Sequence, residues 1–132
     1  MKLITSFLVT FVLIGCSKIN EDTFSLVCSG TEEIASNILK ESKSQTRTLN
    51  FKGKKLDGYD CHTWTNEKIL CSMYVDLGVD HTSKTETINI DRISGMISSN
   101  YTLNIKSPYR ISEFNTTETF NGKCEKVIGK KF

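Results

Sequence analysis

Apolar and polar residues alternate with a period of two from Thr46 almost to the end of the chain, and this alternation constrains the fold more than any other feature. A period of two places successive side chains on opposite faces of a β-strand. Several short strands separated by Gly, Asn, Asp and Ser residues are typical of a β-sandwich or barrel. We therefore predict a mainly β domain, either a small antiparallel sandwich or a partly closed barrel. The predicted strands cover residues 46–51, 59–64, 69–75, 87–92, 97–105, 109–114 and 120–128.

Two of these strands, 59–64 and 69–75, are predicted to form a hairpin around the polar residues 65–68. If Cys61 lies opposite Cys71, antiparallel pairing also places Thr63 opposite Ile69 on the same face.

The segment before the alternation is predicted to contain a first strand at Phe24–Cys28 and then one short helix over residues 31–42. The sequence Ser29-Gly30-Thr31-Glu32 matches a helix capping box. Because the helix has no basic face, we expect its apolar side to pack on the core of the domain and not on a membrane. The apolar residues that fall on that side are Ile34, Ala35, Ile38 and Leu39.

The first fifteen residues have the layout of a secretory signal. Lys2 supplies a positive charge, residues 3–14 are mostly apolar, and Gly15 is a small residue at the expected cleavage point. The apolar run is too short for a transmembrane helix, which needs about 20 residues. One interpretation is an ordinary signal peptide that happens to end near a cysteine.

The residues Leu13-Ile14-Gly15-Cys16 resemble the lipobox of bacterial lipoproteins. This resemblance covers residues 1–16 and implies that residues 1–15 are a cleaved signal peptide. It also implies that Cys16 carries a diacylglycerol and an N-acyl chain, on a lipidated tether of residues 16–23 that leads into a single domain, residues 24–132. Each buried methylene contributes about 0.8 kcal/mol to membrane binding, so three acyl chains make a lasting anchor.

The same resemblance implies a place in the cell. Residue 17 is Ser, whereas an Asp at that position retains enterobacterial lipoproteins in the inner membrane. The resemblance therefore implies anchoring in the outer membrane, at its periplasmic face. Two further segments, Asp91–Gly95 and Phe120–Cys124, resemble parts of small exported bacterial β-proteins that have no assigned activity.

The cysteines that remain after Cys16 predict disulfides, because their number is even and an exported chain meets an oxidising compartment. Four cysteines allow three pairings. We expect Cys61–Cys71, which flank the predicted hairpin, and Cys28–Cys124, which lie near the two ends of the folded part. Loop-entropy arguments give about 2–3 kcal/mol for the short bridge and about 4–5 kcal/mol for the long one.

Charge and motifs exclude several function classes. The chain has 17 Lys and Arg against 15 Asp and Glu, without a basic stripe, so nucleic acid is not an expected partner. No nucleophile elbow, dinucleotide fingerprint or phosphate loop occurs, so we expect neither an enzyme nor a cofactor beyond the lipid. His62 lies beside Cys61, but no Cys-x-x-Cys pair occurs, and disulfides explain the cysteines better than a metal site.

The expected function is therefore binding, with the membrane through the lipid and with a periplasmic protein through the domain. Aromatic side chains dominate protein interfaces, and they supply the candidate interface. Two alternatives remain: an inhibitor of a cell-wall hydrolase, by analogy with lysozyme-inhibiting lipoproteins, and a phage-encoded lipoprotein that masks a surface receptor. The sequence leaves the oligomeric state open. The candidate interface residues are Tyr59, Trp64, Tyr74 and Tyr101.

Overall fold

Eight antiparallel strands build one curved sheet in the computed structural model, which describes residues 23–78, 82–106 and 114–127. Their order across the sheet is β3-β2-β1-β8-β7-β6-β5-β4, so the first and last strands are neighbours near its centre. A mainly β architecture is thereby confirmed. The strands are β1 (Phe24–Ser36), β2 (Lys40–Lys52), β3 (Lys55–Leu56), β4 (Asp60–Trp64), β5 (Lys68–Asp76), β6 (Ser83–Asp91), β7 (Met96–Ile105) and β8 (Phe114–Val127).

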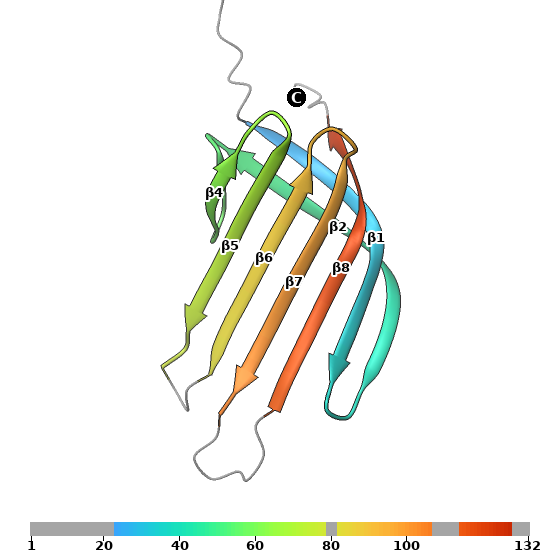
Figure 1. The fold of residues 1–132 in the computed structure, drawn as a ribbon, viewed down its shortest axis with the longest axis vertical. Helices are drawn as coiled ribbons and strands as arrows, with labels where there is room; N and C mark the ends of the chain where they lie inside the picture. The colour runs from blue at the N-terminus through green and yellow to red at the C-terminus, as the bar shows by residue number, and fades with distance from the viewer. Residues whose placement is uncertain (1–22, 79–81, 107–113, 128–132) are drawn as a thin grey trace, which may run out of the picture.

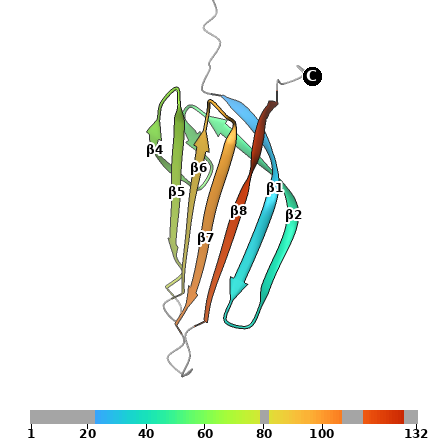
Figure 2. The same cartoon turned by 45° about the vertical axis from the view of Figure 1, so that its right-hand side comes forward.

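The sheet curls over itself into a nearly closed, barrel-like form (Figure 1). Strands β5 to β8 form one wall, and the first half of β1 crosses behind it together with the second half of β2 (Figure 2). The edge strands β3 and β4 meet there, and the backbone nitrogen of Tyr59 donates to the carbonyl oxygen of Leu56 at 2.9 Å.

The two ends of this sheet differ. We call the end that contains the start of β1, the β6–β7 turn (residues 92–95) and the end of β8 the closed end. The opposite end contains the β1–β2 turn (residues 37–39), the end of β5 and the end of β7, and we call it the open end.

A pair of glycines allows the sheet to curl. Gly30 on β1 lies directly opposite Gly122 on β8. A Cβ atom on Gly122 would lie 2.5 Å from the carbonyl oxygen of Ser29, and one on Gly30 would overlap the carbonyl oxygen of Asn121. Only glycine permits two backbones to approach this closely on the inner face of a bent strand pair.

Apolar side chains from every strand fill the closed end. Strand alternation turns them inward, and removing such side chains from water is the dominant favourable contribution to folding. Phe24, Phe51 and Trp64 pack together, with ring centroids 5.1–6.1 Å apart. The buried core consists of Leu26, Cys28, Phe51, Leu56, Ile69, Cys71, Ile88, Ile90, Ile97, Phe120 and Cys124.

Two disulfides cross-link this core. Cys28–Cys124 joins β1 to β8 over a sequence separation of 96 residues, and Cys61–Cys71 joins β4 to β5 over 10 residues. In both, the bonded cysteines lie directly opposite each other on neighbouring strands, with Cα atoms 3.9 Å apart. These are the two pairs that the sequence predicted.

The helix predicted over residues 31–42 is wrong. Residues up to Ser36 belong to β1, residues from Lys40 onward belong to β2, and the turn between them is closed by the Ser36 nitrogen donating to the Leu39 oxygen at 2.8 Å. Pairing with β2 and β8 satisfies this backbone, so tertiary context overrides the local helical pattern.

The predicted register of the β4–β5 hairpin is also partly wrong. Cys61 lies opposite Cys71 as expected, and the turn is closed by the Thr65 nitrogen donating to the Lys68 oxygen. A bulge at residue 62 then shifts the register, so that Thr63 lies opposite Leu70 and Trp64 opposite Ile69.

The signal peptide, Cys16 and the strand predicted at 109–114 lie outside the described residues, apart from Phe114 at the start of β8. Within the described part of the chain, no helix is long and apolar enough to cross a membrane.

Candidate functional site

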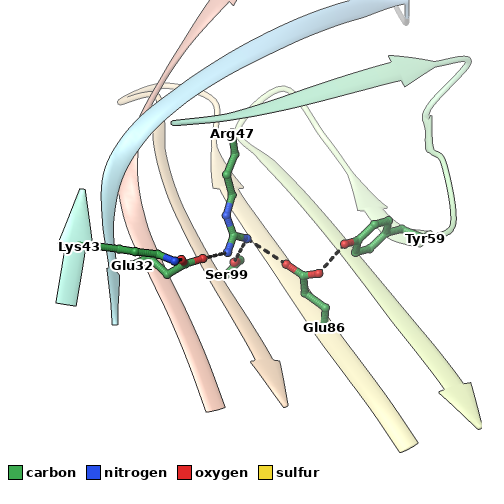
Figure 3. Close-up of polar contacts among 6 residues, drawn as sticks. All are labelled: Glu32, Lys43, Arg47, Tyr59, Glu86 and Ser99. Carbon is green, nitrogen blue, oxygen red and sulfur yellow. Dashed lines mark hydrogen bonds and ion pairs between the residues drawn. The ribbon is translucent and has the colours of Figure 1, made fainter. Parts of the chain in front are cut away.

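Charged and polar side chains from both walls of the sheet meet inside it, between the packed core and the open end (Figure 3). Strand alternation explains their inward direction. Glu86 precedes the buried Ile88 by two residues, and Ser99 follows the buried Ile97 by two. We call this cluster the inner network, and its members are Glu32, Lys43, Arg47, Tyr59, Glu86 and Ser99.

Arg47 is the centre of the inner network. Its Nη2 donates to Oε1 of Glu32 at 2.5 Å, and its Nη1 donates to Oγ of Ser99 at 3.0 Å and to Oε1 of Glu86 at 3.2 Å. The guanidinium also lies over the ring of Phe120, 4.8 Å from the centroid. Arg47 therefore joins β2 to β6 and β7, which are not its neighbours in the sheet.

The two carboxylates have further partners. The hydroxyl of Tyr59 donates to Oε2 of Glu86 at 2.5 Å, and Nζ of Lys43 lies 3.1 Å from Oε2 of Glu32. With its amide nitrogen turned toward the carboxylate, Gln45 also donates to Glu32. Charge-assisted hydrogen bonds of this kind are stronger than neutral ones.

The surroundings shift the pKa values of two members of the inner network, Glu32 and Tyr59, and of the neighbouring Tyr101. Burial alone would raise the pKa of Glu32, but the hydrogen bonds and charges of Arg47 and Lys43 outweigh burial and hold this pKa below its ordinary value. Burial raises the pKa of Tyr59, and its hydrogen bond to Glu86 raises it further. The pKa of Tyr101, which lies opposite Glu86 in the β6–β7 register, is also raised, first by burial and then by the charges of Glu118 and Glu86.

The inner network is arranged to hold two walls of the sheet together. In the described residues, every buried side-chain nitrogen and oxygen has a hydrogen-bond partner. A buried charge is expensive unless it is paired, so the satisfied partners fix one another in place. The inner network thus forms a polar boundary between the core and the open end.

Beyond this boundary, the inner face of the open end is lined with half-buried apolar and aromatic side chains. They follow the same inward alternation on β1, β5, β7 and β8. Lys84 and Glu118 are the charged residues among them, at inward positions of β6 and β8. The apolar and aromatic lining consists of Ile34, Met73, Val75, Tyr101, Leu103, Ile105 and Phe114.

Large apolar side chains are also exposed at the rim of the open end. Ile38, at the tip of the β1–β2 turn, is 86% exposed, and Leu39 beside it is also exposed. Leu77, just after β5, is the third exposed apolar residue of this rim. Exposed apolar side chains on the turns of one end are typical of a surface that contacts another molecule.

The outer face of the β4–β5 hairpin carries a row of three polar side chains, Ser72, His62 and Asp60. Oγ of Ser72 lies 2.6 Å from Nε2 of His62, and Nδ1 of His62 lies 3.6 Å from the nearest Asp60 oxygen. A hydrolytic triad needs a carboxylate that is hydrogen-bonded to the imidazole and shielded from water. Asp60 is 88% exposed and its distance is too long for a hydrogen bond, so the row is a solvated contact between strands.

A cavity of about 210 Å³ lies at the closed end. Phe24, Leu26, Ile69 and Ile90 supply apolar walls, while Asp91, Arg92 and Lys126 supply charges. Nζ of Lys126 lies 5.2 Å from the centroid of the Phe24 ring, and the guanidinium of Arg92 lies 6.0 Å from the centroid of the Trp64 ring.

The four aromatic residues of the predicted interface do not gather in one exposed patch. Tyr74 is exposed on the outer face of β5, whereas Trp64 packs against Phe24 and Phe51 in the closed end. Tyr59 and Tyr101 both face the interior near Glu86, the first as its hydrogen-bond donor. The sequence thus identified two residues of the inner surface and missed the charged residues beside them.

Within the described ranges, no group of three or more His, Cys, Asp or Glu side chains is placed to hold a metal ion. Comparison with protein-family models, with curated proteins and with solved structures finds no match to this chain.

Proposed function

We propose that this protein is a lipid-anchored binding domain of the bacterial cell envelope. Cys16 carries the lipid at the outer membrane, and the open end of the sheet binds a protein partner in the periplasm. Binding is the function, and the domain catalyses no reaction.

The exposed apolar rim of the open end is the observation that carries this proposal. Ile38, Leu39 and Leu77 lie exposed on turns around an inner face on which apolar and aromatic side chains accompany Lys84 and Glu118. Interfaces between proteins place such side chains at their centre, where they lose contact with water on binding. The satisfied inner network supports the same proposal, because it gives the binding surface a rigid base.

Site-specific photo-crosslinking in cells that produce the lipidated protein tests this proposal. A photoreactive amino acid at position 38 should give a discrete protein adduct. The same amino acid at position 121, exposed on the outer face of β8, should give none. Equal crosslinking at both positions, or no protein adduct at position 38, would contradict a specific partner at the open end.

A second candidate function is inhibition of a cell-wall hydrolase, and the shape of the β1–β2 hairpin favours it. The tip of this hairpin carries two exposed aliphatic residues, Ile38 and Leu39, and lies at the far end of the molecule from the start of β1 (Figure 1). Such a tip could enter the cleft of a hydrolase. A lysozyme assay with the Cys16→Ser protein should then show inhibition that Ile38→Asp abolishes, and no inhibition at micromolar protein would end this candidate.

A further inference from the structure

Exposed apolar side chains gather at the closed end as well as at the open end. Ile93 in the β6–β7 turn is 78% exposed, Met96 at the start of β7 is 50% exposed, and Val127 at the end of β8 is 45% exposed. All three belong to the end of the sheet at which β1 begins (Figure 1). They take no part in the core or in the inner network.

Cations lie at the same end of the sheet as these side chains. Arg92 and Lys126 border the cavity of the closed end, and Lys68 begins the neighbouring β5. Lys52 ends β2 beside the first residues of β1, and Lys123 on β8 lies directly opposite Met96.

The acidic residues of this end are fewer, and one of them is engaged in a turn. Among the described residues, the acids of this end are Glu67 in the β4–β5 turn, Asp91 at the end of β6 and Glu125 near the end of β8. Oδ1 of Asp91 accepts hydrogen bonds from the backbone nitrogens of Ile93 and Ser94, both at 2.9 Å. Among the described residues of the closed end, the cations therefore outnumber the acids.

The length of the preceding chain limits how far this end can lie from the proposed lipid anchor. If Cys16 carries lipid, only residues 17–23 separate the acyl chains from the start of β1. Seven residues span at most about 25 Å when fully extended. In that case the start of β1, and with it the closed end, lies within this distance of the membrane surface.

We propose that the closed end docks on the anionic bilayer surface, with Ile93, Met96 and Val127 inserted among the headgroups and with Arg92 and Lys126 beside the lipid phosphates. Apolar side chains next to cations are the combination that binds anionic interfaces. This inference rests on the proposed lipid anchor. It adds an orientation, because a docked closed end points the open end away from the membrane and toward a periplasmic partner.

Fluorescence quenching by brominated lipids tests this orientation in the full-length, lipidated protein. Trp64 is the single native tryptophan, so a new tryptophan is measured as the change against the unmodified protein. Ile93→Trp places the probe at the closed end, and Ile38→Trp places a matched, similarly exposed probe at the open end. Circular dichroism confirms that each variant is folded.

Vesicles that contain phosphatidylglycerol with brominated acyl chains should quench the added tryptophan of Ile93→Trp and leave that of Ile38→Trp unquenched. Lys126→Gln in the Ile93→Trp protein should reduce the quenching. Equal quenching of the two probes would overturn the proposal, because the domain would then rotate freely on its tether. Quenching of Ile38→Trp alone would overturn it as well.

The mass of the purified protein shows whether Cys16 carries acyl chains. It therefore distinguishes a failure of the proposed lipid anchor from a failure of the docking proposal. A protein without acyl chains contradicts the lipid anchor. The same quenching measurement on that unlipidated protein then decides the inference by itself: quenching of Ile93→Trp without quenching of Ile38→Trp supports docking of the closed end, and no quenching of either probe overturns it.

Discussion

Arg47 on β2 and Ser99 on β7 are joined across the interior by a hydrogen bond of 3.0 Å, although β1 and β8 lie between their strands in the sheet. The bond exists because the sheet curls until β2 faces β7. The same guanidinium binds Glu32 and Glu86, so one side chain holds the curled sheet together where backbone pairing does not.

Replacing Arg47 should therefore destabilise the fold strongly. Arg47→Met leaves Glu32 and Glu86 inside the sheet without the cation that they share, and removing one member of a buried ion pair costs about 3–5 kcal/mol. Urea unfolding of the Cys16→Ser protein, with its disulfides intact, measures the change. Lys43→Gln is the control, because Lys43 is half exposed and should contribute less than about 1 kcal/mol. An Arg47→Met protein as stable as Lys43→Gln would contradict a bracing role.

Acid should weaken the contribution of Glu32. Its folded-state pKa lies below its ordinary value of 4.5, so the unfolded chain takes up this proton before the folded chain does. The stability from Glu32 is complete above pH 4.5 and is lost as the pH falls below that value through the folded-state pKa. We expect the difference in unfolding free energy between the native protein and Glu32→Gln to shrink from pH 7 to pH 3. A difference that is constant over this range would show that Glu32 does not titrate as described.

The close approach of β1 and β8 predicts that Gly122 tolerates no larger residue. The Cβ atom of Gly122→Ala would lie 2.5 Å from the Ser29 oxygen, so the backbones must separate, at a cost of about 3 kcal/mol. Asn121→Ala, on the exposed outer face, should change stability by less than about 0.5 kcal/mol. Thermal unfolding of the two variants makes the comparison, and equal midpoints would mean that the glycine pair does not determine the bend.

The row of Ser72, His62 and Asp60 should not catalyse hydrolysis. Because Asp60 is solvated and 3.6 Å from the imidazole, nothing fixes His62 as a base for Ser72. We expect the native protein and Ser72→Ala to hydrolyse an activated ester such as p-nitrophenyl acetate at the same rate. Turnover that disappears in Ser72→Ala would contradict a function limited to binding.

The sequence predicted those parts of the fold that depend on local pattern. Alternation after Thr46 identified most strands. The predicted hairpin identified Cys61–Cys71, and the positions of Cys28 and Cys124 near the two ends of the folded part identified the other disulfide. The helix prediction over 31–42 failed because Gly30 and Glu32 occupy inward positions of β1, where an apolar residue would have continued the strand pattern.

The inner network could not be predicted for a related reason. The partners of Arg47 lie 15, 39 and 52 residues away in the chain, so their meeting depends on the curl of the whole sheet. The one available signal is a charged residue at an inward position, such as Glu86 two residues before Ile88. That signal indicates a buried charge without naming its partner.

The lipid on Cys16 is the central claim, and the most direct test is to fractionate Gram-negative cells that produce either the native protein or Cys16→Ser and to measure the mass of each product. We predict that the native protein is recovered in the outer membrane, cleaved before Cys16 and heavier by three acyl chains, whereas Cys16→Ser is recovered without lipid in the soluble fraction. Two soluble products without added mass would contradict the anchor and leave a secreted domain with one cysteine outside its two disulfides.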